Sequence, residues 1–578
     1  MAGSTLDIEN LLEPSTLATA IAANYDEWSS LRQAWIDEKK ELRNYIFATD
    51  TSTTSAGALP WANSTTTPKL TQIYDNLKAN YSAALFPNAD WMRWEADDVE
   101  SDTLDKKEVI QSYMETKLAQ SKFEVTADRL VDDYILYGNC FATVDYVEEL
   151  SETEIGEQVY SYIGPKLVRI SPYDIVFNPA VAEFRSTPKI IRSIVQLGEA
   201  KKMVESGLGP EYGDVFGKMI NNRRAVGSST STDKSEGFVA DGFSSIEHYY
   251  GSNYVEVLTF YGDMYDPSTE QVVENHKIVV VDRAYVISNA PVASWLGSAP
   301  IFHAGWRSRP DNLYAMGPLD NLVGMQYRID HLENLRADVF DQIAFPIQII
   351  QGDVEDYDLR PGAKIFVGEE GSVSYLRPDV TALNADFQIQ ALENKMEELA
   401  GAPRQAMGIR TPGEKTAFEV QSLNQAAGRI FQHKAEKFER EFIQPVLNGM
   451  LESARRNMDV SDTIRVLSSE DAVTSFRNIK RDDIKGNGKL KPIGASHFAE
   501  RARRVQNLQQ LLGFKQDPTI APHLSGKVIA KILADELGEK ALFGVNIAVQ
   551  EQLETQKVMQ DAEAQNIQQL EEKAELGI

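Results

Sequence analysis

Cysteine and long apolar runs are scarce in this sequence of 578 residues. The single cysteine, Cys140, cannot form a disulfide within the chain, which fits a reducing compartment. A lone cysteine is more often a small buried apolar residue than a nucleophile. No apolar run reaches the roughly 20 residues that span a bilayer, and the first residues lack the basic and apolar regions of a signal peptide. We therefore expect a cytosolic protein that does not enter a membrane.

Positive charge is also in short supply. The chain has 58 Lys and Arg against 86 Asp and Glu, so its formal net charge is -28 and its pI is about 4.8. Such a surface repels phosphate at long range, whereas a tight nucleic-acid binder normally has the opposite sign. An acidic protein can still guide DNA if its task is to let the DNA slide, because few Lys and Arg contacts hold the phosphates.

Sequence motifs for nucleotide binding and catalysis are missing. The segments 213–219 and 486–489 are rich in glycine but lack the spacing of a P-loop, so we expect turns there and no ATP-driven motor in this chain. There is no Gly-x-Ser-x-Gly and no His-Glu-x-x-His, and His331 and His433 are isolated on expected helices. We therefore expect no catalytic residue, no metal site and no cofactor.

Two acidic groups keep an enzymatic alternative open. Carboxylates that converge from separate segments can hold a divalent ion, and the candidates here are Asp97, Asp98, Glu100, Asp132 and Asp133. The simpler interpretation is a solvated acidic turn and helix face. A metal-dependent nuclease built on these side chains remains an alternative.

The composition itself is ordinary for a globular protein. Hydrophobic residues make up 42% and charged residues 25%, and the length suggests three to four domain-sized parts. Hydrophobic spacing predicts four early helices, at 16–47, 69–85, 102–120 and 123–137, with an exposed loop at 49–68. Trp91 and Trp94 lie between two of them, where we expect core or interface packing rather than base stacking.

The middle third of the sequence has the pattern of small mixed sheets. Strands are predicted at 140–148, 158–163, 166–170, 254–261, 271–281, 284–288 and 301–306, with a helix at 196–205. The run 171–179 has a proline near each end, which marks an edge strand or a rigid turn. The stretch 221–246 is rich in Ser, Gly and charge and predicts a loop.

The order of elements between 311 and 457 is distinctive. A helix at 318–343 begins near Pro318, and a compact β segment with strands at 345–350, 363–367 and 372–376 follows it. A return helix is predicted at 384–400, a Gly/Pro loop at 401–413, and a longer helix at 414–456 that Pro445 should kink. Helices at 495–538 and an acidic, Gln-rich helix at 546–575 complete the chain.

This order resembles the portal, or head-to-tail connector, proteins of tailed bacteriophages, especially short-tailed ones. The resemblance covers roughly 70–540. Gly413-Glu414-Lys415-Thr416-Ala417-Phe418-Glu419-Val420 is similar to the Thr-Ala-x-Glu-Val stretch that opens the long helix in that family. The Pro-flanked strand at 171–179 and the turn at 360–364 are similar as well. The acidic tail is too short for a long helical barrel.

The resemblance implies an α+β, portal-like subunit with an α/β wing, an antiparallel helical stem, a small β clip and a helical C-terminal crown. Its expected parts are N-terminal helices and wing at 1–310, stem helix 1 at 311–343, clip at 344–381, stem helix 2 at 382–400, channel (tunnel) loop at 401–413, long kinked helix and wing return at 414–494, and crown with the acidic Gln/Glu-rich tail at 495–578.

The resemblance also implies a function. Copies of the chain, typically twelve, would form a ring at one vertex of the virion capsid, assembled in the host cytoplasm. Double-stranded DNA would pass through the ring without tight binding, both when it is packaged and when it is ejected. Expected partners are the major capsid and scaffolding proteins, the terminase and the tail adaptor proteins.

The same resemblance assigns residues to these parts. The expected channel-loop residues, with transient DNA contact, are Arg404, Arg410 and Lys415. The expected stem-helix residues are Leu322, Ile329, Leu332, Leu335, Ile389, Leu392 and Met396. The expected clip residues, for docking of terminase or tail proteins, are Arg360, Pro361, Gly362 and Lys364. The alternative within structural proteins is a capsid or tail component without a channel.

Overall fold

The fold is α+β, as the sequence predicts. The computed structural model describes residues 5–8, 13–47, 65–86, 91–98, 101, 103–152, 158–181, 183–207, 254–292, 298–344, 347–351, 371–376, 380–401, 429–459, 461–467, 474–494 and 556. The chain divides into two compact units. Unit 1 comprises Met1–Tyr81, Asp128–Thr143 and Arg169–Lys434, and unit 2 comprises Ser82–Ala127, Val144–Val168 and Ala435–Ile578.

A mainly antiparallel sheet dominates unit 1. Its strands follow in the order β5 (Ile175–Phe177), β6 (Lys189–Gln196), β7 (Tyr254–Asp266), β8 (Gln271–Val281) and β9 (Tyr285–Pro291), and β1 (Leu6–Asp7) pairs in parallel with the end of β7. The short β5 is an edge strand. This confirms one of the two interpretations of the Pro-flanked run at 171–179.

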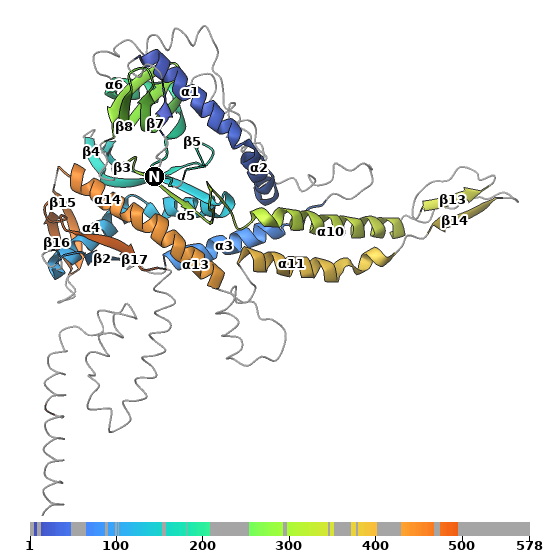
Figure 1. Cartoon of the computed structure of the whole chain (residues 1–578). Helices are drawn as coiled ribbons and strands as arrows, with labels where there is room; N and C mark the ends of the chain where they lie inside the picture. Colours follow the sequence, from blue (N-terminus) through green and yellow to red (C-terminus); the bar gives the residue numbers. More distant parts are fainter. Residues whose placement is uncertain are drawn as a thin grey trace, which may run out of the picture. The chain divides into compact units, whose positions relative to one another are not determined.

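Successive side chains of a strand point to opposite faces of the sheet. In this sheet both sets of side chains are apolar, and each face packs against a helix. Helix α1 (Pro14–Leu31) packs on the face that carries Leu258, Phe260, Ile278 and Val280. Helix α6 (Leu197–Gly207) packs on the opposite face, and Figure 1 shows the sheet between the two helices. The residues of that second core are Ala200, Val255, Val257, Val279, Val281 and Ile287.

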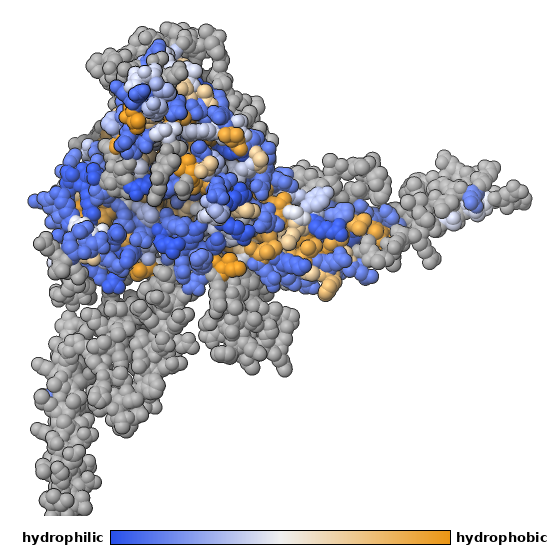
Figure 2. Space-filling model, in the orientation of Figure 1, coloured by the Kyte–Doolittle hydropathy of each residue, from blue (hydrophilic) through white to orange (hydrophobic). Residues whose placement is uncertain are grey.

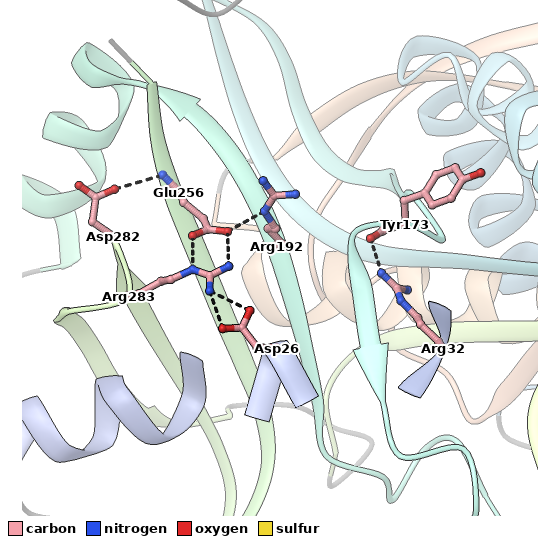
Figure 3. Close-up of polar contacts among 7 residues, drawn as sticks. All are labelled: Asp26, Arg32, Tyr173, Arg192, Glu256, Asp282 and Arg283. Carbon is pink, nitrogen blue, oxygen red and sulfur yellow. Dashed lines mark hydrogen bonds and ion pairs between the residues drawn. The ribbon is translucent and has the colours of Figure 1, made fainter. Parts of the chain in front are cut away.

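The predicted helix at 16–47 is in fact two helices, α1 and α2 (Gln33–Phe47), separated by Arg32. The Arg32 guanidinium is buried and donates hydrogen bonds of 2.6 to 2.8 Å to the backbone carbonyls of Pro172, Tyr173 and Ile175. Figure 3 shows the bond to Tyr173. The break between the helices lets the Arg32 side chain bind the backbone that leads into β5. Hydrophobic periodicity alone does not reveal this break.

A buried ion network crosses the same sheet (Figure 3). Glu256 on β7 accepts hydrogen bonds from Arg192 on β6 and from Arg283, both at 2.7 Å. Arg283 also pairs with Asp26 of α1 at 2.8 Å. Because the Arg192 and Glu256 side chains are nearly inaccessible to solvent, each depends on the other for its charge to be compensated.

A second sheet has the order β10 (Ile301–Gly305), β3 (Asn139–Glu152) and β4 (Gln158–Ile170). The two strands predicted at 158–163 and 166–170 are thus one strand, which continues through Gly164 and Pro165. The hairpin of β11 (Arg307–Arg309) and β12 (Asn312–Met316) follows β10. Cys140 is buried on β3, and burial raises its thiol pKa well above the ordinary value, so it behaves as the expected small core residue.

Helices α3 (Lys69–Leu85), α4 (Leu104–Gln120) and α5 (Phe123–Leu136) lie where the sequence predicts them. In unit 2, β2 (Met92–Ala96) pairs with β17 (Gly488–Pro492), and β15 (Asp462–Leu467) pairs with β16 (Thr474–Ile479). Trp91 stacks on Phe123 and Trp94 is buried, which confirms the expected packing role of both tryptophans.

The predicted long helix is present from Arg429 onward, in three segments. Helix α13 (Arg429–Phe438) passes into a π-helix at Glu439–Ile443, and α14 (Gln444–Asn457) follows. The irregular turn directly precedes Pro445, whose missing N–H cannot support a regular helical bond. The side chains of Phe438, Phe442, Val446 and Leu451 are buried, as their spacing predicts.

Several predicted segments lie outside the described residues. They are residues 49–64 of the loop predicted at 49–68, the loop at 221–246, the clip strand at 363–367, and the C-terminal helices at 495–538 and 546–575 apart from the single residue 556. In the described ranges, no helix combines the length and hydropathy that crossing a bilayer requires.

A candidate helical stem and its anchors

Two helices of unit 1 lie side by side and run antiparallel. They are α10 (Val323–Ala344), which follows a 3-10 turn at Asp320–Leu322, and α11 (Asp386–Ala400). The end of α10 contacts the start of α11, where Arg336 pairs with Asp386. The predicted helix at 318–343 therefore has its first turn in 3-10 form, and the predicted return helix at 384–400 is confirmed (Figure 1).

A two-stranded ladder connects the far ends of the two helices. Strand β13 (Ile347–Gln351) pairs antiparallel with β14 (Ser372–Leu376), with Ile347 opposite Leu376 and Gln351 opposite Ser372. Two of the three predicted clip strands are thus present. The turn at 360–364, with Arg360, Pro361, Gly362 and Lys364, lies outside the described residues.

Helix α11 ends where the sequence predicts. Gly401 has φ +75°, a left-handed conformation that glycine adopts without strain, and its N–H bonds to carbonyls in the last turn. The channel-loop residues Arg404, Arg410 and Lys415 lie beyond this point, outside the described residues.

Buried ion pairs anchor the other end of the helix pair. Lys39 of α2 pairs with Asp320 just before α10, and both side chains are almost fully buried. Lys69 at the start of α3 pairs with Glu397 of α11 at 2.6 Å, again with both side chains buried. Because an unpaired charge would be costly at either place, these pairs fix α10 and α11 to the helices α2 and α3.

One face of α10 is polar, although it is buried. Gln326, Asp330 and Asn334 are spaced four residues apart, so they share a face of the helix. Each binds the backbone of the segment 65–70, which is extended up to Pro68 and helical from Lys69. Asp330 accepts from the Thr67 N–H at 2.8 Å, and Asn334 both accepts from the Thr65 N–H at 2.8 Å and donates to the Thr65 carbonyl at 3.0 Å. These three side chains form a polar ladder.

The third side chain of the ladder completes it. Gln326 donates to the Thr67 carbonyl at 2.6 Å and accepts from the Leu70 N–H at 3.2 Å. Burial raises the pKa of Asp330 to about 6, against the hydrogen bonds from Thr67 and Gln326 that favour its charged form. The ladder thus supplies hydrogen bonds to backbone groups of an extended segment that belongs to none of the described sheets.

Large apolar side chains lie exposed along the same helix pair. Phe387 is 82% exposed, Tyr327 is 55% exposed and Phe340 is 54% exposed. Figure 2 shows hydrophobic surface gathered over α10 and α11. The complete set on the two helices is Tyr327, Leu335, Phe340, Ile343, Phe387 and Leu399. Exposed apolar side chains of this number on one helix pair are typical of a surface that another molecule covers.

The predicted stem residues divide between buried and exposed positions. Leu322, Ile329, Leu332, Ile389 and Met396 are buried, and Leu392 is half-buried. Leu335 is exposed, together with Ile343, although apolar periodicity places both on the packed face. At 100° per residue these two side chains lie on the side of α10 that faces away from the polar ladder, and there they are 42% and 44% exposed. In the sequence, the four-residue spacing of Gln326, Asp330 and Asn334 indicates that this helix has a polar face.

The start of the long helix is fixed by a second cluster in unit 1. Lys434 of α13 donates to the Trp306 carbonyl at 2.6 Å, and its ammonium lies 4.5 Å from the centre of the Trp306 ring. The indole N–H of Trp306 donates to the Tyr81 hydroxyl at 3.0 Å. The sequence offered no pattern that linked these three residues.

Three of the five acidic candidates for a metal site, Asp98, Asp132 and Asp133, accept hydrogen bonds from other groups of the chain, and Glu100 lies outside the described residues. Asp133 pairs with Arg169 through two hydrogen bonds of 2.6 Å, and burial raises its pKa to about 6. Asp132 accepts hydrogen bonds from Tyr74 and Lys78. Asp98 accepts from the Ser101 N–H at 2.6 Å. Among the described residues, no three His, Cys, Asp or Glu side chains form a metal-binding group.

The two histidines singled out on helices are both exposed, His331 on α10 and His433 on α13. In comparisons with known proteins, no family model matches this chain and no curated protein is recognisably related to it.

Proposed function

We propose that this chain is a subunit of the portal ring of a tailed bacteriophage, the channel through which viral DNA is packaged and ejected. The observation that carries the proposal is the antiparallel pair α10 and α11, connected by the β13–β14 ladder and followed, after a glycine cap, by the long helix. A helix pair tipped by a small sheet is the arrangement that the stem and clip of such a subunit require.

The exposed apolar side chains support a ring. A subunit that repeats around an axis uses two different surfaces, one on each side, in a head-to-tail contact that closes by rotation. Here exposed apolar residues occur on both helices, for example Phe340 on α10 and Phe387 on α11. Neighbouring copies that cover them would remove this surface from water, which favours association by about 25 cal/mol per Å² of apolar area.

The net charge of -28 supports passage of DNA rather than retention. A hole lined by such a chain would hold few phosphates, so that affinity stays modest and falls steeply with salt. The proposed partners are the terminase and tail adaptors at the clip, the capsid and scaffolding proteins around the ring, and duplex DNA inside it. No catalysis by this chain is part of the proposal.

Negative-stain electron microscopy of the purified full-length protein tests the proposal. The expected result is closed rings with a central hole. A double variant, Leu335→Asp with Phe340→Asp, should abolish the rings because it places charge on the surface that a neighbour covers.

The matched control is Val125→Asp with Val272→Asp, which adds the same charge at two exposed apolar positions on other elements, α5 and β8. It should leave the rings intact. A protein that stays monomeric at high concentration in all salts would overturn the proposal. Closed assemblies without a hole would favour another capsid or tail component instead.

A further inference from the structure

A cationic pocket lies in unit 2, in a chain that is otherwise strongly acidic. It has a volume of about 400 Å³ and is lined by Glu452, Arg455, Arg456, Arg481, Lys485 and Gly486. Two of its arginines come from the last turn of α14, and the other two cations come from the turn that connects β16 to β17 (Figure 1). Four of the lining residues are therefore cationic, and one, Glu452, is a carboxylate.

Two hydrogen bonds to backbone carbonyls connect the two segments. The Arg455 Nε donates to the Ile484 carbonyl at 2.9 Å, and the Arg481 Nε donates to the Arg455 carbonyl at 2.5 Å. A carbonyl accepts a hydrogen bond but carries no net charge. These contacts therefore position the guanidinium groups without neutralising them.

Carboxylates compensate the cluster only in part. Glu452 is shared between Arg456, at 3.0 Å, and Arg455, at 3.6 Å. Lys485 pairs with Asp482 at 2.7 Å, but both side chains are largely exposed, so this pair is weak and easily exchanged.

Arg455 is the least accessible cation of the pocket. Its side chain is 16% exposed, its guanidinium lies 5.4 Å from the centre of the Trp94 ring, and its Nη2 is buried without a hydrogen-bond partner among the described residues. Burial lowers the pKa of Arg455, against the attraction of Glu452. The contacts within the protein thus do not replace the hydration that this guanidinium has lost.

A favourable position at a helix C-terminus explains only half of the cluster. Cations in the last turn of a helix interact well with its carbonyl end, which accounts for Arg455 and Arg456. Arg481 and Lys485 come from a different segment. Their convergence on the same pocket needs a further cause.

We propose that this pocket binds a phosphate group through Arg455, Arg456, Arg481 and Lys485. Guanidinium groups match the geometry of phosphate oxygens, which can accept two parallel hydrogen bonds from one arginine. The pocket volume lies in the range of small-ligand sites. Lys485, which is 56% exposed, adds a point charge at the edge of the pocket.

The proposed phosphate group belongs to the backbone of duplex DNA. This choice of source rests on the proposed function. A single cationic pocket in an acidic surface would touch DNA at few phosphates. Binding would then be weak, would lose strength steeply with salt, and would be local rather than spread over the surface. The alternative source of the same chemistry is free inorganic phosphate.

The test uses the full-length protein and two double variants of equal charge change. The pocket variant is Arg481→Gln with Lys485→Gln, which leaves the buried Arg455 in place. The control is Arg440→Gln with Lys166→Gln, which removes one arginine and one lysine that are 69% and 37% exposed in the same unit. Affinity for a fluorescein-labelled 20-base-pair duplex is measured by anisotropy as salt is varied, and affinity for inorganic phosphate is measured separately by isothermal titration calorimetry.

We expect the pocket variant to bind the duplex about tenfold more weakly, with a salt slope reduced by about 1 to 2, and the control to stay within about twofold of the original protein. If inorganic phosphate binds to the protein and binds more weakly to the pocket variant, while the duplex does not bind, the phosphate pocket stands but duplex DNA is overturned as the source of the phosphate group. No binding of either probe, or an equal loss in both variants, would overturn the pocket itself. Negative-stain images of the same samples report ring formation separately, so failure of the portal proposal is distinguishable.

Discussion

The sheet of unit 1 and the helix pair α10–α11 solve the same packing problem in opposite ways. In the sheet, both faces are covered by helices of the same chain, and its charged residues Arg192 and Glu256 compensate each other inside. In the helix pair, polar side chains are buried and aromatic ones are exposed. The sheet is complete within one chain, whereas the helix pair has the surface of a part that is completed by another molecule.

The largest effect should come from the core of the sheet. Phe260 of β7 is fully buried in the core that the sheet forms with α1, so Phe260→Ala should lower the free energy of unfolding of unit 1 by about 4 kcal/mol. Denaturant unfolding followed by circular dichroism measures this. Phe387→Ala, at an aromatic that is 82% exposed, is the matched control on the helix pair and should change the same transition very little.

The next effect concerns charge. Glu256→Gln should cost about 3 kcal/mol, because Arg192 and Arg283 would keep their charges without the carboxylate that both contact. On the helix pair, Asp386→Asn removes an ion pair whose carboxylate is 76% exposed, and it should cost no more than about 0.5 kcal/mol. Equal losses in the two variants would contradict the distinction between the regions.

A pH-dependent effect is expected at Lys189, on β6. Its ammonium is buried and donates to the carbonyls of Phe184 and Arg185, and burial lowers its pKa to about 7. The folded protein therefore binds fewer protons here than the unfolded chain between pH 7 and the ordinary lysine pKa, so stability increases as pH rises through this window.

From pH 7 to pH 9 this contribution amounts to about 2 kcal/mol. Lys189→Met should remove that increase, as measured by denaturant unfolding at both pH values. An unchanged pH dependence in the variant would show that Lys189 is not its source.

The smallest effect on folding, and the sharpest on assembly, is expected from the exposed face of α10. Phe340→Ser should change the free energy of unfolding by less than about 0.5 kcal/mol, because the ring is already 54% exposed. Analytical ultracentrifugation should nevertheless show weaker self-association. A large loss of stability with unchanged association would instead assign Phe340 to the core.

Local patterns in the sequence predicted the helix pair well. The bounds of α11 and the end of α10 follow from apolar spacing and from the glycine and proline signals next to them. Local patterns could not predict which polar groups meet across the chain. Arg32 binds carbonyls about 140 positions away, and Gln326 binds a segment about 260 positions earlier. Such side chain–backbone bonds leave no periodic trace in the segment whose backbone they bind.

The buried face of α10 shows the same limit. Helical spacing alone assigns Leu335 and Ile343 to the inside because they are apolar. The side of α10 that binds the extended segment 65–67 instead carries Asp330 and Asn334, and Leu335 and Ile343 lie on the side that faces away from it, exposed to solvent. The cationic pocket was hidden for a related reason. Arg455–Arg456 and Arg481 are ordinary charged positions in their own segments, and only the fold brings them together.

The pairing of β2 with β17 has a consequence for how the chain is made. Ala96 and Gly488 are partners in one ladder although about 390 residues separate them. At a synthesis rate of about 5–20 residues per second, β2 with its Trp94 waits for roughly 20 to 80 seconds on the ribosome before its partner strand exists. Over that interval unit 2 stays unfinished, and a chain truncated before β17 would leave this strand edge open to aggregation.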